Sequence, residues 1–169
     1  GFSQGIYIIL FEAGKIPPHL LLSVNGKVFS ITASGRQMGS PLEKLLLFIK
    51  RKNIATVFAE VKKPAGLSTE KTENITKEHF SNYDRVIEGK ISCLFPVRDV
   101  MAEFFGDEMQ KANFIFELLP LLKKQNATGN VYELNMPHLV INGRFELLTY
   151  TQDQLKEALQ AANEETRLS

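Results

Sequence analysis

The sequence has one cysteine, no tryptophan and no excess of charge of either sign. Because Cys93 is the only cysteine among 169 residues, the chain cannot form an internal disulfide or a zinc site built on several cysteines. The 20 Lys and Arg residues are balanced by 19 Asp and Glu residues. A surface that binds nucleic-acid phosphates needs a basic excess, so we do not expect nucleic acid as a partner.

Long apolar runs and clusters of metal ligands are also missing. No apolar run approaches the roughly 20 residues that cross a bilayer, so we expect a soluble chain without a transmembrane segment. His19, His79 and His138 lie far apart in the sequence, and no two of them have the spacing of a local metal site. We therefore expect neither a metal nor another cofactor.

The first five residues, Gly-Phe-Ser-Gln-Gly, are small and polar like those that often follow a signal peptide. We expect export to the periplasm or envelope of a bacterium, and a cytoplasmic location stays open. A hydrophobic content of 44% and a charged content of 23% are ordinary globular values. With this length they predict a single domain over residues 1 to 169.

Apolar patterning predicts strands in the first third of the chain. Residues 6 to 11 form a β-branched and aromatic run between glycines, as in a strand buried on both faces. Residues 19 to 24 and 27 to 32 flank Asn25-Gly26, and this dipeptide favours a type I′ hairpin turn. We predict a β-hairpin there, followed by a loop over residues 34 to 39.

Helices and loops are predicted further along. Ser40 is the expected N-cap of a helix with Pro41 first and Glu43 third, and residues 54 to 61 form another expected strand. Residues 63 to 81 are rich in Pro, Gly, Ser, Thr, Glu and Lys, which predicts a mobile loop that is either a lid over a cleft or a surface insertion. Helices are expected over residues 97 to 105, 114 to 124 and 151 to 163, and a strand pair over 131 to 134 and 139 to 148.

The segment around Cys93 carries the candidate chemistry. Cys93 stands between an expected strand and an expected helix that ends at Gly106, so its sulfur lies near a helix N-terminus. There the backbone N–H groups and the helix dipole stabilise a thiolate, and the Cys93 amide could hold an oxyanion. The pattern therefore favours a nucleophile, although a single free cysteine is also a common core residue.

A nucleophilic cysteine needs a base and a group that orients the base. His19 is the favoured base because it opens an apolar strand, His138 has a similar context, and His79 is expected to be solvent-exposed. Counting back from the Asn25-Gly26 turn pairs His19 with Thr32, which makes Thr32, or else Ser30, the candidate orienting residue.

Two stretches together resemble the NlpC/P60 superfamily of papain-like hydrolases, in its circularly permuted form. Residues 18 to 31, from Pro18-His19 through Asn25-Gly26 to Ser30, are similar to the histidine hairpin of that family. Ser92-Cys93-Leu94-Phe95 is similar to the start of its cysteine helix. The hairpin precedes the cysteine helix here, as in permuted members, and the match covers residues 6 to 106.

The resemblance implies an α+β papain-like fold, in which an antiparallel sheet packs against helices. Residues 1 to 106 would form the core, with residues 107 to 169 as an α/β extension packed on it. It also implies a cysteine peptidase or amidase that acts on cell-wall peptides, or a hydrolase of acyl bonds. Cys93 would attack the carbonyl carbon, His19 would protonate the leaving group, and water would release the acyl group. The alternative is a catalytically inactive binding or scaffold protein of the bacterial envelope.

Overall fold

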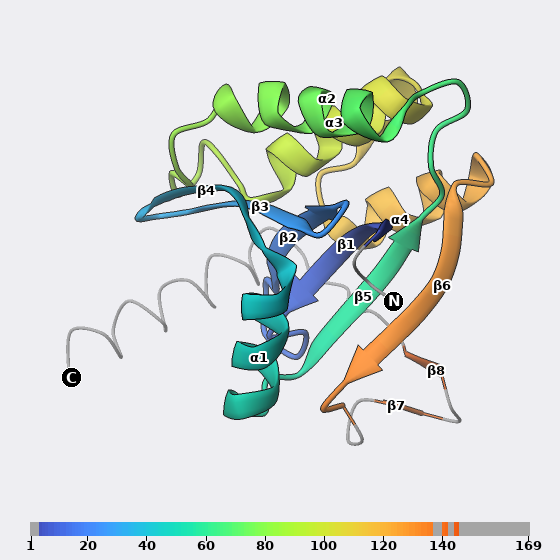
Figure 1. Cartoon of the computed structure of the whole chain (residues 1–169). Coiled ribbons are helices and arrows are strands. Elements are labelled where there is room, and N and C mark those ends of the chain that lie inside the picture. Colours follow the sequence, from blue (N-terminus) through green and yellow to red (C-terminus); the bar gives the residue numbers. More distant parts are fainter. Residues whose placement is uncertain (1–3, 137–139, 142–143, 146–169) are drawn as a thin grey trace.

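A computed structural model describes residues 4 to 136, 140 to 141 and 144 to 145 of the chain (Figure 1). The predicted helix over residues 151 to 163 and His138 lie outside the described residues. The described part is α+β, with an antiparallel sheet between one helix on one side and several on the other, as Figure 1 shows. The predicted class is therefore confirmed at this level.

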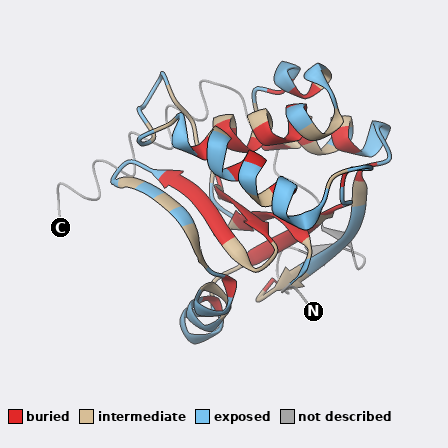
Figure 2. Cartoon of the chain, turned by 45° about the horizontal axis from the view of Figure 1, so that its top comes forward, coloured by how far each residue is buried: buried red, intermediate tan, exposed pale blue. Residues whose placement is uncertain are grey.

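Within the described residues the sheet has six strands in the order β4-β3-β2-β1-β5-β6, and every neighbouring pair is antiparallel. Its strands are β1 (Ile6–Phe11), β2 (His19–Val24), β3 (Lys27–Thr32), β4 (Gly35–Pro41), β5 (Thr56–Val61) and β6 (Thr128–Leu134). The central strands are the most apolar, and Figure 2 shows them in the buried middle of the molecule. β1 lies at the centre because both of its edges pair with other strands along the whole strand.

The predicted hairpin is confirmed. Asn25 and Gly26 have φ angles of 52° and 79°, which a type I′ turn requires at both central positions. The register Val24↔Lys27 and Leu22↔Phe29 follows directly from that two-residue turn.

The predicted loop over residues 34 to 39 is wrong from Gly35 onward, because residues 35 to 39 belong to β4 and only Ser34 lies in a turn. This strand pairs with β3 from Thr32↔Gly35 to Lys27↔Pro41. Gly39, with a φ of 89°, lies at a bulge where the register shifts between Val28 and Phe29. A short polar edge strand with two glycines has the composition of a loop, and its pairing with β3 makes it a strand.

Helix α1 (Leu42–Lys52) also differs from the prediction at its first residue. Pro41 is the N-cap and makes no side-chain capping hydrogen bond, and Ser40 belongs to β4. The backbone N–H of Leu42 donates instead to the carbonyl of Gly26, at 2.9 Å. The helix start is therefore set by the neighbouring hairpin and not by a serine cap.

The predicted loop over residues 63 to 81 is wrong in its second half, where α2 (Thr69–Ser81) forms a helix. The side chain of Ser68 caps it by accepting a hydrogen bond from the N–H of Lys71. Its buried face consists of Thr72, Ile75, Thr76 and Phe80. Two of these four buried residues are threonines. The apolar residues alone therefore do not show the helical spacing of this segment.

The remaining described elements are α3 (Leu94–Phe105), the 3-10 helix η2 (Asp107–Lys111), α4 (Ile115–Lys124), β7 (Val140–Ile141) and β8 (Arg144–Phe145). Of these, α3, η2 and α4 contribute buried residues to the core. Pro120 lies inside α4 without ending it. β6 pairs with β5, and β7 with β8, whereas we predicted that residues 131 to 134 pair with 139 to 148. Residues 107 to 136 thus share the sheet and the core of the preceding residues.

The sheet separates two apolar clusters. The larger one joins alternate strand residues such as Leu20 and Leu22 to α2, α3 and α4. The smaller one joins the intervening residues, such as Leu21 and Tyr7, to Leu42 and Ile49 of α1. Because successive residues of a strand point to opposite faces, each strand residue can be assigned to one cluster or the other.

Candidate functional site

The strand expected before Cys93 does not form, because residues 88 to 90 make a turn and Ile91 makes only an isolated bridge with Ile87. Cys93 itself lies immediately before α3, as the sequence predicts. It is the N-cap of that helix, and the N–H of Leu94 bonds to the hydroxyl of Ser92 at 3.0 Å. Cys93 is a free, half-buried residue that packs against the larger apolar cluster. The hydroxyl of Ser92 therefore helps to fix the start of the helix.

The surroundings of the Cys93 sulfur oppose ionisation. Burial raises the pKa of the Cys93 thiol, while the backbone N–H groups of Leu20 and of Cys93 itself lower this pKa to a lesser extent. These amides are the donors that a helix N-terminus and an adjacent strand can offer to a sulfur. Because burial is the largest effect, the protonated thiol is favoured at neutral pH.

His19 is the first residue of β2 and is half-buried. Its ring meets the ring of Phe11 edge to face, at 6.3 Å between centroids, and Phe11 in turn stacks on Phe48 of α1. Burial lowers the pKa of His19, and the carboxylate of Glu12 raises it to a lesser extent. The imidazole is therefore favoured in its neutral form, which is the form that a general base requires.

Cys93 and His19 lie at the same end of the sheet but face different sides of β2. Leu20 belongs to the cluster that includes Cys93, whereas Leu21 belongs to the α1 cluster. By strand alternation His19 lies on the side of Leu21, next to Phe11, which also packs against the α1 cluster. Among the described residues, no hydrogen bond or ion pair joins Cys93 to His19.

Thr32 lies close to His19, as the register predicts, but its hydroxyl is engaged locally. The Thr32 hydroxyl accepts from the N–H of Ser34 at 3.2 Å and donates to the carbonyl of Gly35 at 3.3 Å. These bonds hold the β3–β4 turn together. Ser30 is buried, and its hydroxyl donates to the side-chain carbonyl of Gln37 at 3.1 Å.

His19 and Thr32 line one hollow of about 270 Å³, which we call the His19 hollow. Its other lining residues come from β3, the following turn and β4: Ser30, Ser34, Gly35, Arg36 and Gln37. Hydroxyl, amide, imidazole and guanidinium groups surround it, so it can bind a polar ligand through hydrogen bonds. Arg36 and Gln37 were not predicted as site residues because the strand that carries them was read as a loop.

A polar cluster next to α3 also escaped the sequence analysis. The hydroxyl of Tyr83 makes a short hydrogen bond to Asp99, whose other oxygen accepts from Gln110 at 2.9 Å. Burial raises the pKa of Tyr83 to about 12, and Asp99 adds to this shift. Arg98 lies over the ring of Phe95, 4.5 Å from its centroid. Tyr83 also contacts Phe95, so this cluster anchors the first turn of the cysteine helix.

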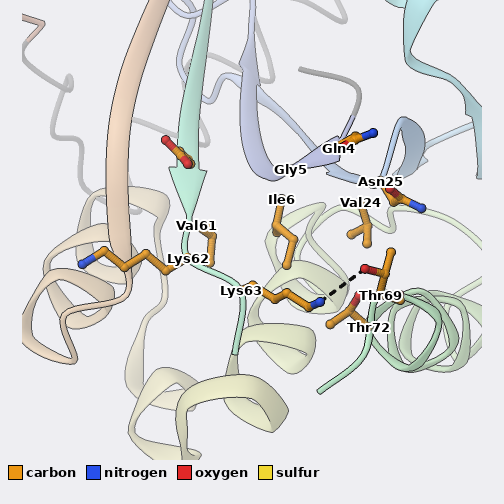
Figure 3. Close-up of a pocket in the computed structure, with 11 residues that line it drawn as sticks. Gln4, Gly5, Ile6, Val24, Asn25, Val61, Lys62, Lys63, Thr69 and Thr72 are labelled. Carbon is orange, nitrogen blue, oxygen red and sulfur yellow. Dashed lines mark hydrogen bonds between the residues drawn. The ribbon is translucent and has the colours of Figure 1, made fainter. Parts of the chain in front are cut away.

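A second hollow, of about 210 Å³, lies at the opposite end of β2 (Figure 3). Buried Ile6, Val24 and Val61 contribute its apolar part. Lys63 reaches across it to the hydroxyl of Thr69 at 3.3 Å, as Figure 3 shows. None of the three candidate catalytic residues, Cys93, His19 and Thr32, lines this hollow.

His79 was expected to be solvent-exposed, but it is half-buried on α2. Its Nε2 atom lies 2.8 Å from a carboxylate oxygen of Glu103 on α3, so it links the two helices. In the part of the chain that the structure describes, no cluster of three or more His, Cys, Asp or Glu side chains could hold a metal.

Comparisons with family models, with curated proteins and with solved structures found no match to this chain. Among the described helices, none is both long enough and apolar enough to span a bilayer.

Proposed function

We propose that this chain is a catalytically inactive papain-like domain of the bacterial envelope, which binds a peptide or acyl ligand in the His19 hollow without cleaving it. One observation carries the proposal: Cys93 and His19 face opposite sides of β2. A base must come within hydrogen-bond reach of the thiol to remove its proton. Burial also raises the pKa of the Cys93 thiol, which favours the protonated, weakly nucleophilic form at neutral pH.

The papain-like fold in this proposal rests on how the sheet, the histidine hairpin and the cysteine helix are arranged. An antiparallel sheet carries the histidine hairpin, and a later helix begins at the cysteine and packs on the first residues of the histidine strand. This arrangement agrees with the resemblance between residues 6 to 106 and the permuted NlpC/P60 proteins. A domain of this kind can keep its ligand site after it has lost its chemistry, because binding and bond cleavage place different demands on the same residues.

The lining of the His19 hollow supports a peptide or acyl ligand. Nη1 of Arg36 donates to the carbonyl of Ser81 at 2.9 Å and lies 3.9 Å from the carboxylate of Asp84. The remaining N–H groups of Arg36 can pair with a ligand carboxylate, and the side-chain amide of Gln37 can donate to a ligand carbonyl. Phe11 contacts both His19 and Phe48. The exposed apolar side chains of α1 therefore lie near the His19 hollow. A ligand with an amide or ester group and a terminal carboxylate matches this mixture of groups.

Thiol-dependent hydrolysis is the second candidate, and one observation favours it. The backbone N–H of Leu20, the residue after His19, lies against the Cys93 sulfur. The thiol and the imidazole are therefore carried by adjacent parts of the structure. A local change at the start of β2 that turned His19 toward α3 would assemble the pair.

Alkylation of Cys93 by iodoacetamide across pH separates the two candidates. We expect slow labelling of the native protein at pH 6, with the same rate in His19→Ala, and fast labelling only at alkaline pH or after unfolding in urea. Fast labelling at pH 6 that slows in His19→Ala would establish an imidazole-supported thiolate and reject the inactive assignment. His79→Ala is the matched control, because it removes a histidine that contacts Glu103 and not the sulfur.

Binding is tested by titrating the protein with a cell-wall peptide and with an N-acyl amino acid while backbone amide resonances are recorded. We expect shifts confined to residues around the His19 hollow, and weaker binding in Arg36→Gln. Lys90→Gln is the control, since Lys90 is exposed and does not line the hollow. Shifts centred on the second hollow, or none with either ligand, would contradict the proposed site.

A further inference from the structure

Helix α1 presents an outward face that combines large apolar side chains with cations. Lys44, Leu47, Phe48 and Arg51 have the spacing i, i+3, i+4 and i+7, which places them on one side of a helix. Leu47 and Phe48 are 60% and 46% exposed, which is high for such large apolar side chains. The opposite side of α1 carries Leu42 and Ile49, both buried against the sheet.

The cations of α1 have no internal partners in the part of the chain that the structure describes. Lys44, Lys50, Arg51 and Lys52 are all exposed, and none forms an ion pair or a side-chain hydrogen bond there. Glu43 is the only acidic residue of the helix. The last turn alone holds three of the four cations, so the charge is concentrated beside Leu47 and Phe48.

This combination differs from the other exposed apolar side chains of the described residues. Val131 and Tyr132 are adjacent in β6 and are also exposed, but successive strand residues point to opposite faces and cannot form one patch. Met38 and Ile87 lie on separate elements, β4 and the segment before α3. On α1, two neighbouring apolar side chains share one helix face with cations on both sides.

We propose that this outward face of α1 docks on an anionic lipid surface. Leu47 and Phe48 would enter the boundary between headgroups and acyl chains, while Lys44, Lys50, Arg51 and Lys52 would lie at the lipid phosphates. Figures 1 and 2 place α1 on the side of the sheet away from α2 and α3, with most of its surface exposed. The helix can therefore meet a flat surface without obstruction from that layer.

Charge and apolar character together favour lipid over other occupants. A nucleic acid could pair its phosphates with the cations, but these phosphates offer no apolar surface on which Leu47 and Phe48 could be buried. A second copy of the chain would bring the same four cations against themselves in a symmetric contact, where they repel. An anionic membrane satisfies both features because it offers negative phosphates above an apolar layer.

Vesicle binding of the full chain tests this proposal. The protein is mixed with vesicles of phosphatidylcholine, or of phosphatidylcholine and phosphatidylglycerol in equal parts, and the bound fraction is measured by sedimentation. We expect binding to the anionic vesicles that weakens with added salt, and little binding to the neutral ones. Equal binding to both compositions, or to neither, would overturn the proposal.

Insertion of the apolar pair is measured directly with Leu47→Trp. Because the chain has no tryptophan, the new indole is the only one in the protein. We expect its emission to shift to shorter wavelength on anionic vesicles, since the ring leaves water. In Val131→Trp, the matched control on β6, the emission should stay unchanged. An unchanged emission in Leu47→Trp would reject insertion.

Paired substitutions separate lipid docking from simple attraction between charges. We expect Leu47→Ser/Phe48→Ser to lower the partition coefficient about tenfold or more, and Lys50→Gln/Arg51→Gln to lower it roughly fivefold for each cation. The controls Ile87→Ser/Val131→Ser and Lys77→Gln/Lys90→Gln change exposed residues elsewhere and should bind as the wild type does. If only the charge variant lost binding, the surface would be a general polyanion site, and the lipid assignment would be wrong. Circular dichroism confirms that each variant is folded.

Discussion

At the residue scale, the surroundings of Cys93 and His19 decide their chemistry more than their identities do. Burial raises the pKa of the Cys93 thiol and lowers the pKa of the His19 imidazole, so both are favoured in neutral forms. An active thiolate–imidazolium pair needs the opposite shifts, which mutual contact would provide. The two side chains lack that contact because His19 lies on the α1 side of β2, whereas Cys93 packs with Leu20 on the other side.

The lowered pKa of His19 predicts a loss of stability in mild acid. As the pH falls through about 6.5, the unfolded chain binds a proton at His19 that the folded protein resists, so the free energy of unfolding falls. Below the lowered folded-state pKa this loss levels off. Urea unfolding between about pH 8 and pH 5 should show the decline in the wild type and a flatter profile in His19→Gln. Identical profiles in the two proteins would contradict it.

Phe29 is one of the large, fully buried residues whose truncation should cost much stability. It is fully buried, and its ring lies 5.7 Å from that of Phe80, so it joins β3 to α2. We expect Phe29→Ala to lower the free energy of unfolding by about 3–5 kcal/mol, from lost burial and a residual cavity. Phe48→Ala, on the exposed face of α1, should cost less than about 1 kcal/mol. Chemical denaturation measures both, and similar losses would contradict the assigned burial.

At the element scale, α2 is held to the hairpin turn by one carboxylate. Glu73 accepts from the Asn25 amide and from the Lys27 ammonium, both at 2.8 Å. These hydrogen bonds lower the pKa of Glu73, with the Lys27 bond as the largest effect. Glu73 thus connects the Asn25-Gly26 turn, which the sequence predicts, to α2, which the sequence does not predict.

Replacement of Glu73 tests this link. We expect Glu73→Gln to lower the free energy of unfolding by about 1 kcal/mol at neutral pH, a modest value because Lys27 is partly exposed. A lowered carboxyl pKa stabilises the folded state above the ordinary Glu value near 4.3, and this contribution is lost as the pH falls through the lowered pKa. The difference from wild type should therefore shrink once the pH falls below the ordinary Glu value. Glu78→Gln, an exposed change on the same helix, should show no such dependence.

At the scale of the whole molecule, stability should be highest in β1 and lowest at the sheet edges. β1 pairs on both sides and its residues from Ile6 to Leu10 are buried, whereas β4 pairs only with β3 among the described strands. We expect the amides of Ile8 and Leu10 to exchange with deuterium only through global unfolding. The amides of Gln37 and Met38 should exchange much faster, through local opening. Equal protection in β1 and β4 would show that the edge is covered in solution.

The sequence by itself determined the features whose signals are local. Alternating and continuous apolar runs gave β1, β2, β3 and β5, Asn25-Gly26 gave the hairpin register, and the spacing before Gly106 gave α3 with Cys93 at its start. Each follows from backbone sterics or from the period of the side chains, which neighbouring residues specify without reference to the rest of the fold.

Only the tertiary structure decided the features that depend on distant partners. β4 is a strand because β3 is beside it, and α2 is a helix whose threonines are acceptable inside because their hydroxyls bond to the helix backbone. The side of β2 to which His19 turns, and thus its separation from Cys93, follows from which cluster each residue joins. Burial, pairing and face are properties of segments brought together from far apart in the chain, so no local pattern encodes them.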